Sequence, residues 1–172
     1  MVLVASLAAY WYLQEGRERE ETVERTGDLR LLALRDPTAC MEVLSALRKE
    51  GRISTGELLL LVELSLEVPG FTPDAAGLAE LEQRLPDGSA VSVLKASLQY
   101  HEGRVRGAVE SLRALTEKEK EDRRALYALH RILWVRGLIE DRIRAKGALR
   151  ELSRTKDEWG YRALRVLVFS RP

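Results

Sequence analysis

The side chains that most often carry catalysis or bind metals are few in this chain and far apart. There is one cysteine, Cys40, and there are two histidines, His101 and His130. A zinc site needs several cysteine or histidine ligands close together, and this spacing predicts none. The dinucleotide-binding, P-loop, zincin and serine-hydrolase motifs do not occur in the sequence. The sequence therefore predicts no enzyme, no cofactor and no metal site.

The remaining reactive residues fit a structural interpretation. Cys40 lies inside an amphipathic pattern, which favours a small buried residue over a reactive thiol. Each histidine is expected at the surface or in a groove. The many carboxylates are scattered over predicted solvated helix faces, so that no acid–base pair stands out.

Basic residues gather in the second half of the chain. Residues 1–100 hold 10 Lys and Arg against 16 Asp and Glu, whereas residues 101–172 hold 18 against 11. The basic end is expected to favour acidic partners. One basic run suits either a solvated helix face or a nucleic-acid contact, and the acidic residues among it favour the solvated face. This run consists of Arg142, Arg144, Lys146, Arg150, Arg154 and Lys156.

The first residues form an apolar segment. Residues 1–13 are apolar apart from one serine and two tyrosine hydroxyls, and charged residues follow directly. A helix of this length spans about 20 Å, against roughly 30 Å for the hydrocarbon core of a membrane. Residues 1–20 are therefore predicted to form an N-terminal helix that either anchors the chain through residues 1–14 or packs on the other helices. If the segment is an anchor, Arg17 and Arg19 directly after it favour a repeat domain on the cytoplasmic side of the membrane. A chain without an anchor is also expected to be cytoplasmic.

Nearly every segment has helical periodicity, and turn residues separate the segments. Prolines at a first helical position and capping boxes mark several helix starts. These starts are Asp36-Pro37, Thr72-Pro73, Ser54-x-x-Glu57, Thr116-x-x-Glu119 and Thr155-x-x-Glu158. The predicted helices are residues 2–25, 28–34, 38–50, 55–68, 73–85, 89–102, 105–117, 121–136, 139–154 and 157–169.

A pair of leucines recurs at a nearly fixed distance along these helices. The first three pairs follow one another at 34 residues and the fourth at 37. A period in this range is typical of helical repeat arrays, in which each hairpin buries the apolar face of its neighbour. The sequence therefore predicts an all-α fold of stacked hairpins. The pairs are Leu44 and Leu47, Leu78 and Leu81, Leu112 and Leu115, and Leu149 and Leu152.

The period and the residue pattern resemble the tetratricopeptide repeat (TPR) family. In the best copy, residues 89–122, Gly103 falls at the turn and Ala108-x-x-x-Leu112 is the small and large pair of the second helix. The copies are degenerate, since Asp74 stands where the family has a small residue. The resemblance implies a right-handed α-solenoid of about three to four antiparallel hairpins over residues 21–172, in addition to the N-terminal helix.

In TPR arrays the first helices of the hairpins line a concave groove, and the resemblance assigns groove positions in this chain. Aromatic and arginine side chains are enriched at binding hot spots, and arginine pairs well with carboxylates. The resemblance therefore implies a partner-binding groove for an extended or helical peptide of acidic character. The alternative is that the aromatic residues pack between hairpins, which is favoured for Trp134. The groove residues are Tyr100, His101, Arg124, Tyr127, Arg131 and Trp134.

The predicted last helix is very apolar, and no second helix follows to complete its hairpin. Solenoids usually end in a polar cap. We therefore expect this helix to dock on a partner, on a second copy of the chain, or more completely on the preceding hairpin. Its apolar residues are Trp159, Tyr161, Leu164, Val166, Leu167, Val168 and Phe169.

These features predict a non-enzymatic scaffold or adaptor that binds a peptide or partner protein in its concave groove. The last helix could also join two copies of the chain in a homo-oligomer, and residues 1–14 could contact a membrane. By analogy, the most specific form is a membrane-proximal adaptor in a bacterial envelope or secretion assembly. Two alternatives stay open: an enzyme whose site no motif reveals, and a weak nucleic-acid binder that uses the basic C-terminal half.

Overall fold

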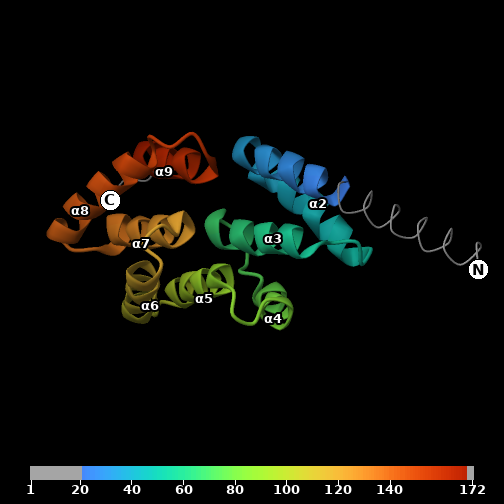
Figure 1. Cartoon of the computed structure of the whole chain (residues 1–172), viewed down its shortest axis with the longest axis horizontal. Helices are drawn as coiled ribbons and strands as arrows, with labels where there is room; N and C mark the ends of the chain where they lie inside the picture. Colours follow the sequence, from blue (N-terminus) through green and yellow to red (C-terminus); the bar gives the residue numbers. More distant parts are fainter. Residues whose placement is uncertain (1–20, 170–172) are drawn as a thin grey trace, which may run out of the picture.

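The computed structural model describes residues 21–169, and this part of the chain is helical almost throughout (Figure 1). Residues 21–35 form the first described helix. The helices that follow are α2 (Pro37–Lys49), α3 (Thr55–Glu67), α4 (Ala75–Arg84), α5 (Ser89–His101), α6 (Val105–Lys118), α7 (Arg123–Arg136), α8 (Ile139–Leu152) and α9 (Glu158–Phe169). The all-α prediction is therefore confirmed over residues 21–169, and most predicted boundaries from residue 37 onward agree to within two residues.

The helices pack mostly on their sequence neighbours and form two layers. The inner helices α3, α5, α7 and α9 contact one another in that order, whereas α2, α4, α6 and α8 lie outside and pack on adjacent inner helices. The series curves strongly, so that α9 lies beside residues 21–35 (Figure 1). There Arg30 and Glu158 form an ion pair between segments 128 residues apart. The curvature thus brings the last described helix back toward the first.

The recurring leucines occupy equivalent places in this arrangement. The first leucine of each pair lies in an outer helix, and all four are buried: Leu44 in α2, Leu78 in α4, Leu112 in α6 and Leu149 in α8. Burial of a leucine side chain contributes about 1.5–3 kcal/mol relative to exposure. The sequence period therefore reports the leucines that attach the outer layer to the inner layer.

Two of the predicted helix starts are confirmed. Asp36 caps α2, and its side chain accepts a hydrogen bond from the backbone N–H of Ala39. Ser54 and Glu57 form a reciprocal capping box at the start of α3. These side chains satisfy backbone N–H groups that have no partner within a helix.

Three predicted helix starts are wrong, because a nearby aspartate caps the helix instead. Asp74 caps α4 and accepts from Gly77, Asp122 caps α7, and Asp157 accepts from the N–H of Gly160 in α9. An aspartate carboxylate adds a favourable charge at the positive end of the helix dipole. The cap of α4 also explains the departure from the repeat at Asp74, which pairs with Arg48 of α2 at 2.6 Å. The residues predicted as starts in place of these aspartates were Thr72, Thr116 and Thr155.

The predicted break between residues 25 and 28 is also wrong, since the helix continues through Gly27 to residue 35. The turns that follow α2, α3 and α5 contain Gly51, Gly70 and Gly103, which adopt positive φ angles that glycine tolerates best.

The prediction for residues 1–20 lies outside the described residues. Within residues 21–169, no helix has both the length and the apolar character needed to cross a membrane.

Within residues 21–169, the core consists of two clusters of buried side chains. One surrounds α3 and includes residues from the helix at 21–35, α2, α4 and α5, while the other surrounds α7 and extends from α5 to α9. Ten consecutive residues of α3, from Glu57 to Leu66, are buried. Because α3 is covered on all sides, its buried carboxylates need partners from other helices.

Candidate functional site

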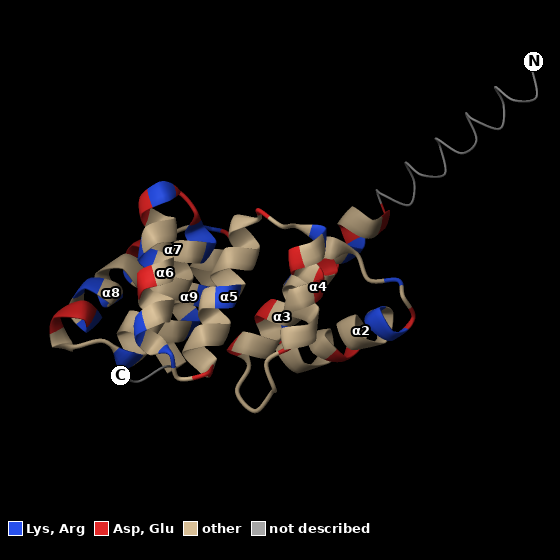
Figure 2. Cartoon of the chain, turned by 90° about the horizontal axis from the view of Figure 1, so that it is seen from below, with Lys and Arg blue, Asp and Glu red and all other residues tan. Residues whose placement is uncertain are grey.

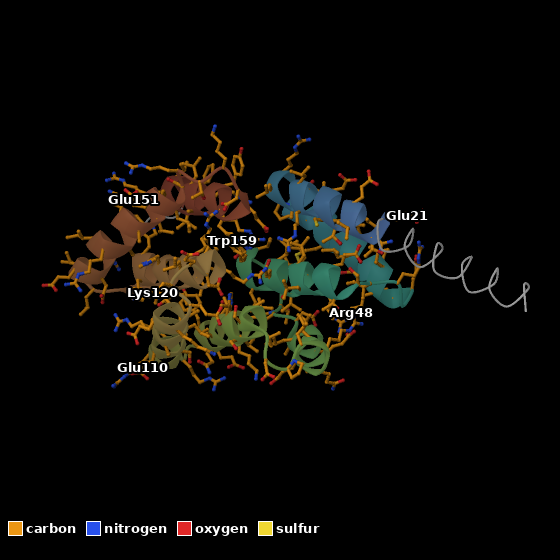
Figure 3. All side chains as sticks on the ribbon, in the orientation of Figure 1. Glu21, Arg48, Glu110, Lys120, Glu151 and Trp159 are labelled. Atoms are coloured by element: carbon orange, nitrogen blue, oxygen red, sulfur yellow. The ribbon has the colours of Figure 1, made fainter. Side chains whose placement is uncertain are left out.

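Charged residues of α3, α7 and α9 meet between the two core clusters. The backbones of α3 and α9 do not pack directly on each other within residues 21–169, and long side chains span the distance between them. Figure 3 labels Trp159 in this central region, where α3, α7 and α9 face one another. We call the charged residues that meet here the central ion cluster. It consists of Glu63, Glu67, Arg124, Arg131, Glu158 and Arg162.

Arg162 of α9 is the centre of this cluster. Its side chain is only 5% exposed, and its guanidinium lies 3.3 Å from a carboxylate oxygen of Glu63 and 3.1 Å from one of Glu67. A third carboxylate, Glu158, lies one helical turn earlier in α9 at 2.5 Å. Since a buried charge is stable only when it is paired and hydrogen-bonded, Arg162 ties α9 to α3.

Two arginines of α7 complete the cluster. The Nε of Arg124 lies 2.6 Å from Oε1 of Glu63, although the two atoms lack the alignment of a hydrogen bond, so that the contact is an ion pair of imperfect geometry. The guanidinium of Arg131 lies 3.9 Å from the nearest oxygen of Glu67. Arg131 is therefore the least tightly paired arginine of the cluster.

Aromatic rings hold these guanidinium groups in place. The ring of Trp159 lies 5.2 Å from the guanidinium carbon of Arg124 and 4.7 Å from that of Arg162. Tyr127 lies 5.7 Å from Trp159 between ring centroids and 5.9 Å from the guanidinium carbon of Arg131. Cations over aromatic rings gain about 0.5–2 kcal/mol, and more when water is excluded.

Burial and neighbouring charges shift the ionisation of these groups. Burial favours the neutral form and raises the pKa of Glu63, while Arg162 and Arg124 oppose this effect. Burial would lower the pKa of Arg162, but the three carboxylates around it outweigh burial and raise its pKa. Burial, together with Glu67, also raises the pKa of the Tyr127 phenol. Arg162 and Tyr127 thus keep their protons at neutral pH.

The structure brings together three of the six predicted groove residues. All three lie on α7, where Arg124 and Arg131 belong to the central ion cluster and Tyr127 lies beside it, and Trp159 and Arg162 of α9 cover them. The space left between α3, α5, α7 and Trp159 is only about 20 Å³, which is too small for a peptide side chain. The predicted groove is therefore filled at this point by α9 of the same chain.

The other three predicted groove residues take no part in the ion pairs of the central ion cluster, although Tyr100 packs against the core cluster around α7. His101 of α5 is 2.5 Å from the carbonyl oxygen of Leu66, which accepts a hydrogen bond from its Nε2, and its ring meets Tyr100 edge to face at 5.6 Å. Trp134 is buried on the side of α7 toward α8, where the amino group of Lys146 lies 5.7 Å from its ring centroid. Trp134 is thus a packing residue between helices, as the alternative interpretation proposed.

A cavity of about 320 Å³ opens beside the central ion cluster, between the start of α2, the end of α3, α7 and α9. Its polar wall consists of Glu67, Tyr127, Arg131, Arg162 and Arg165. Its apolar wall consists of Pro37, Leu64, Val68, Pro69, Val166 and Phe169. A cavity of this size with few converging polar groups fits a small ligand.

The sequence pattern does not reveal that Glu63, Glu67, Trp159 and Arg162 form one unit. One signal was present, because Glu63 and Glu67 are four residues apart in an otherwise leucine-rich helix and therefore share one face. Two carboxylates on a helix that is apolar all round predict a cationic partner. The sequence offered no means of locating that partner 95 and 99 residues away.

The outer face of α9 carries a second feature, an exposed apolar stripe. Tyr161, Leu164 and Val168 follow one another at three and four residues, which places them on one face of the helix. Their exposed fractions are 56%, 48% and 62%. The opposite face of α9, with Gly160, Ala163 and Val166, is buried. The docking expected for the last helix is therefore observed on one side only.

Other chemistry is limited in the described residues. Within residues 21–169, no group of three or more His, Cys, Asp or Glu side chains is placed to hold a metal ion. Burial raises the pKa of the Cys40 thiol to about 11, and its Sγ contacts the carbonyl oxygen of Leu29 at 3.2 Å. A thiol that stays protonated is a poor nucleophile.

The basic run of α8 is mixed with acidic residues. Figure 2 shows both signs of charge on α8. Arg154, just after α8, pairs with Glu151, and Asp141 of α8 pairs with Arg113 of α6. A surface with both signs interspersed gives little net attraction to a polyanion.

No family model, no curated protein and no solved structure matches this chain.

Proposed function

We propose that this protein is a non-enzymatic interaction scaffold of TPR-like hairpins that binds a partner protein through the apolar stripe of α9. The observation that carries the proposal is the exposure of Tyr161, Leu164 and Val168 at helical spacing. Helices with such a stripe bury it against another helix or in an apolar groove. A partner helix laid along α9 would continue the stacking that buries the apolar faces of the earlier hairpins.

The family assignment within this proposal rests on the repeat. The leucines at a period near 34 lie at equivalent positions of α2, α4, α6 and α8, and inner and outer helices alternate along the chain. A small residue accompanies three of these leucines four positions earlier, namely Cys40, Ala108 and Ala145, and all three are fully buried. This pattern supports TPR-like hairpins, and the right-handed superhelix is part of the same proposal.

The concave groove is less accessible to a partner than the apolar stripe of α9. Arg124 and Arg131 already have Glu63 and Glu67 as partners, and α9 covers them. An acidic peptide in this groove would have to replace one of these carboxylates and move α9. Because the stripe needs no such exchange, we assign the first contact of a partner to the stripe.

Affinity capture with the full chain tests the proposal. The variant Leu164→Asp/Val168→Asp places two charges on the stripe, and Ile139→Asp/Ile143→Asp places two charges on exposed apolar residues of α8 as a matched control. Because all four side chains are exposed, circular dichroism is expected to show unchanged folding. The partner captured by the wild type should be lost with the α9 variant and kept with the α8 control.

Capture that is unchanged in the α9 variant, or lost equally in both variants, contradicts the assignment to the stripe. Sedimentation of the purified chain distinguishes a second copy from a different partner, because a self-associating wild type and a monomeric α9 variant identify the chain as its own partner. A deletion of residues 1–14 in the same capture tests the membrane contact separately. If the deletion leaves the chain in the membrane fraction, those residues are not the anchor.

A further inference from the structure

The cavity beside the central ion cluster has an unbalanced charge. The cluster itself has three arginines and three glutamates, so that its formal charges cancel. Two further arginines lie next to it: Arg30, which pairs with Glu158, and Arg165, which lines the cavity. Five guanidinium groups thus share three carboxylates. The excess of positive charge attracts an anion.

Two of these arginines have bonding capacity left for a ligand. The nearest carboxylate oxygen to Arg131 is 3.9 Å away, beyond hydrogen-bond distance. Arg165 has no carboxylate within ion-pair distance among residues 21–169, and its side chain is exposed. Guanidinium groups are weakly hydrated and present N–H groups in a geometry that matches a carboxylate. Both line the same cavity, so that one carboxylate placed there would be near both.

The rest of the cavity wall is apolar. Leu64 and Val68 come from the end of α3, and Val166 and Phe169 come from α9. Phe169 is largely exposed, and a bound apolar group would cover it. Fully burying a side chain of this size contributes about 1.5–3 kcal/mol. The wall therefore suits a short hydrocarbon body rather than a hydrated ion such as phosphate.

We infer that this cavity binds a small organic carboxylate with a short apolar body, whose carboxylate lies between Arg131 and Arg165. The apolar body contacts Val68, Val166 and Phe169. Because α3 and α9 both line the cavity, a bound acid joins the two core clusters and stabilises the arrangement in which α9 lies close to α3. This ligand site differs from the stripe of α9, since Tyr161, Leu164 and Val168 do not line the cavity.

The test uses the full chain with hexanoate, which combines a carboxylate with an apolar body. Hexanol supplies the apolar body alone, and inorganic phosphate supplies the charge alone. Binding is measured by calorimetry and by backbone amide chemical shifts in α7 and α9. We expect one hexanoate per chain, with hexanol and phosphate each bound at least about tenfold more weakly, because each lacks one of the two contacts.

Two variants locate the site. Arg165→Gln removes an exposed charge, leaves the core unchanged, and is expected to weaken hexanoate binding about tenfold. Arg150→Gln removes an exposed arginine from α8, makes the same change in net charge, and is expected to leave the affinity within about twofold. Arg131→Gln serves as a second cavity variant if its thermal unfolding shows that it is folded.

Several results would overturn the inference. They are no saturable hexanoate binding in the millimolar range, binding that Arg165→Gln does not weaken, or an equal loss in Arg150→Gln. Equal affinity for hexanol or for phosphate would also reject an amphiphilic acid. A tetrapeptide with a free C-terminal leucine carboxylate that binds more tightly than hexanoate would assign the cavity to a peptide end instead of a small acid. All of these outcomes are independent of partner capture by the stripe.

Discussion

α3 and α9 are similar inner helices in very different surroundings. Both combine a largely apolar sequence with a few charged residues, and they have 13 and 12 residues. In α3, ten consecutive residues are buried, whereas α9 buries only Gly160, Arg162, Ala163 and Val166. α3 has helices on all sides, while α9 occupies the end of the described inner layer. The position of a helix in the array, more than its composition, determines how much of it is buried.

The same difference governs the charged residues of the two helices. Glu57 and Glu63 of α3 are almost fully buried, and each pairs with an arginine from another helix. In α9, Arg162 is buried and paired, but Arg165, three residues on, is exposed. Charges in α3 are therefore structural. Those of α9 divide into Glu158 and Arg162, which pair with other charged residues, and Arg165, which is exposed.

The largest difference in stability between variants of the two helices is expected from a substitution of a core leucine of α3. Leu60 is fully buried, so that Leu60→Ala removes packed atoms and leaves a cavity. We expect a loss of about 2–5 kcal/mol in the free energy of unfolding. Urea denaturation followed by circular dichroism measures this loss. A cost below about 1 kcal/mol would mean that α3 is not enclosed as described.

A smaller effect is expected from Glu57 at the start of α3, and it should depend on pH. Burial opposes ionisation of Glu57, but hydrogen bonds from Arg25 and Ser54 outweigh burial and lower its pKa below the usual 4.5. A lowered pKa stabilises the folded state above pH 4.5, and this stability is lost as the pH falls through the folded-state pKa. Glu57→Gln should therefore cost about 1–2 kcal/mol at pH 7.

The control for this prediction is the pH dependence of the difference in free energy of unfolding between the wild type and Glu57→Gln. The difference should shrink below pH 4.5, and the stabilities of wild type and Glu57→Gln should converge once the pH has fallen below the lowered folded-state pKa of Glu57. Urea titrations at pH 7 and at successively lower pH values measure the difference. A difference that stays constant over this range would show that the charge of Glu57 does not stabilise the start of α3.

The smallest effect is expected from the stripe of α9. Leu164→Ala makes the same chemical change as Leu60→Ala, but Leu164 is half exposed and lies outside the core clusters. Surface substitutions of this kind usually change stability by about 0.5 kcal/mol or less. Urea denaturation of the isolated chain checks this value. A loss comparable to that of Leu60→Ala would mean that the stripe is buried in solution, for example in an oligomer.

The elements of this fold could largely be predicted from the sequence because helical periodicity and turn residues are local signals. Gly51 and Gly103 mark turns correctly, and Ser54 with Glu57 forms the capping box that the spacing predicts. Caps were wrong where an aspartate lay close to a threonine, as at Asp157 and Thr155, because both side chains can accept the same backbone hydrogen bonds. Such choices depend on the exact start of the helix, which periodicity does not define.

The candidate site was much harder to predict, because its residues meet only through the curvature of the array. Arg124 and Arg131 were singled out as groove residues, but their partners Glu63 and Glu67 lie in α3, two inner helices earlier. The sequence does not distinguish Arg162 from a surface residue, since an arginine in an apolar helix carries no information about its depth. Curvature accumulates over several hairpins, and small differences at each one decide whether α9 reaches α3.

The central claim is that Arg162 of α9 is paired with Glu63 of α3, and a double-mutant cycle tests it most directly. The cycle compares Glu63→Gln, Arg162→Met and the double variant by urea denaturation at pH 7. Each single variant removes this contact and leaves the other residue only its remaining partners, Arg124 for Glu63, and Glu67 and Glu158 for Arg162, while the double variant removes both charges. The pairing predicts an interaction energy of at least about 1 kcal/mol between the two positions. If the stability loss of the double variant equals the sum of the two single losses to within about 0.3–0.5 kcal/mol, the two residues are not in contact and α9 does not close on α3.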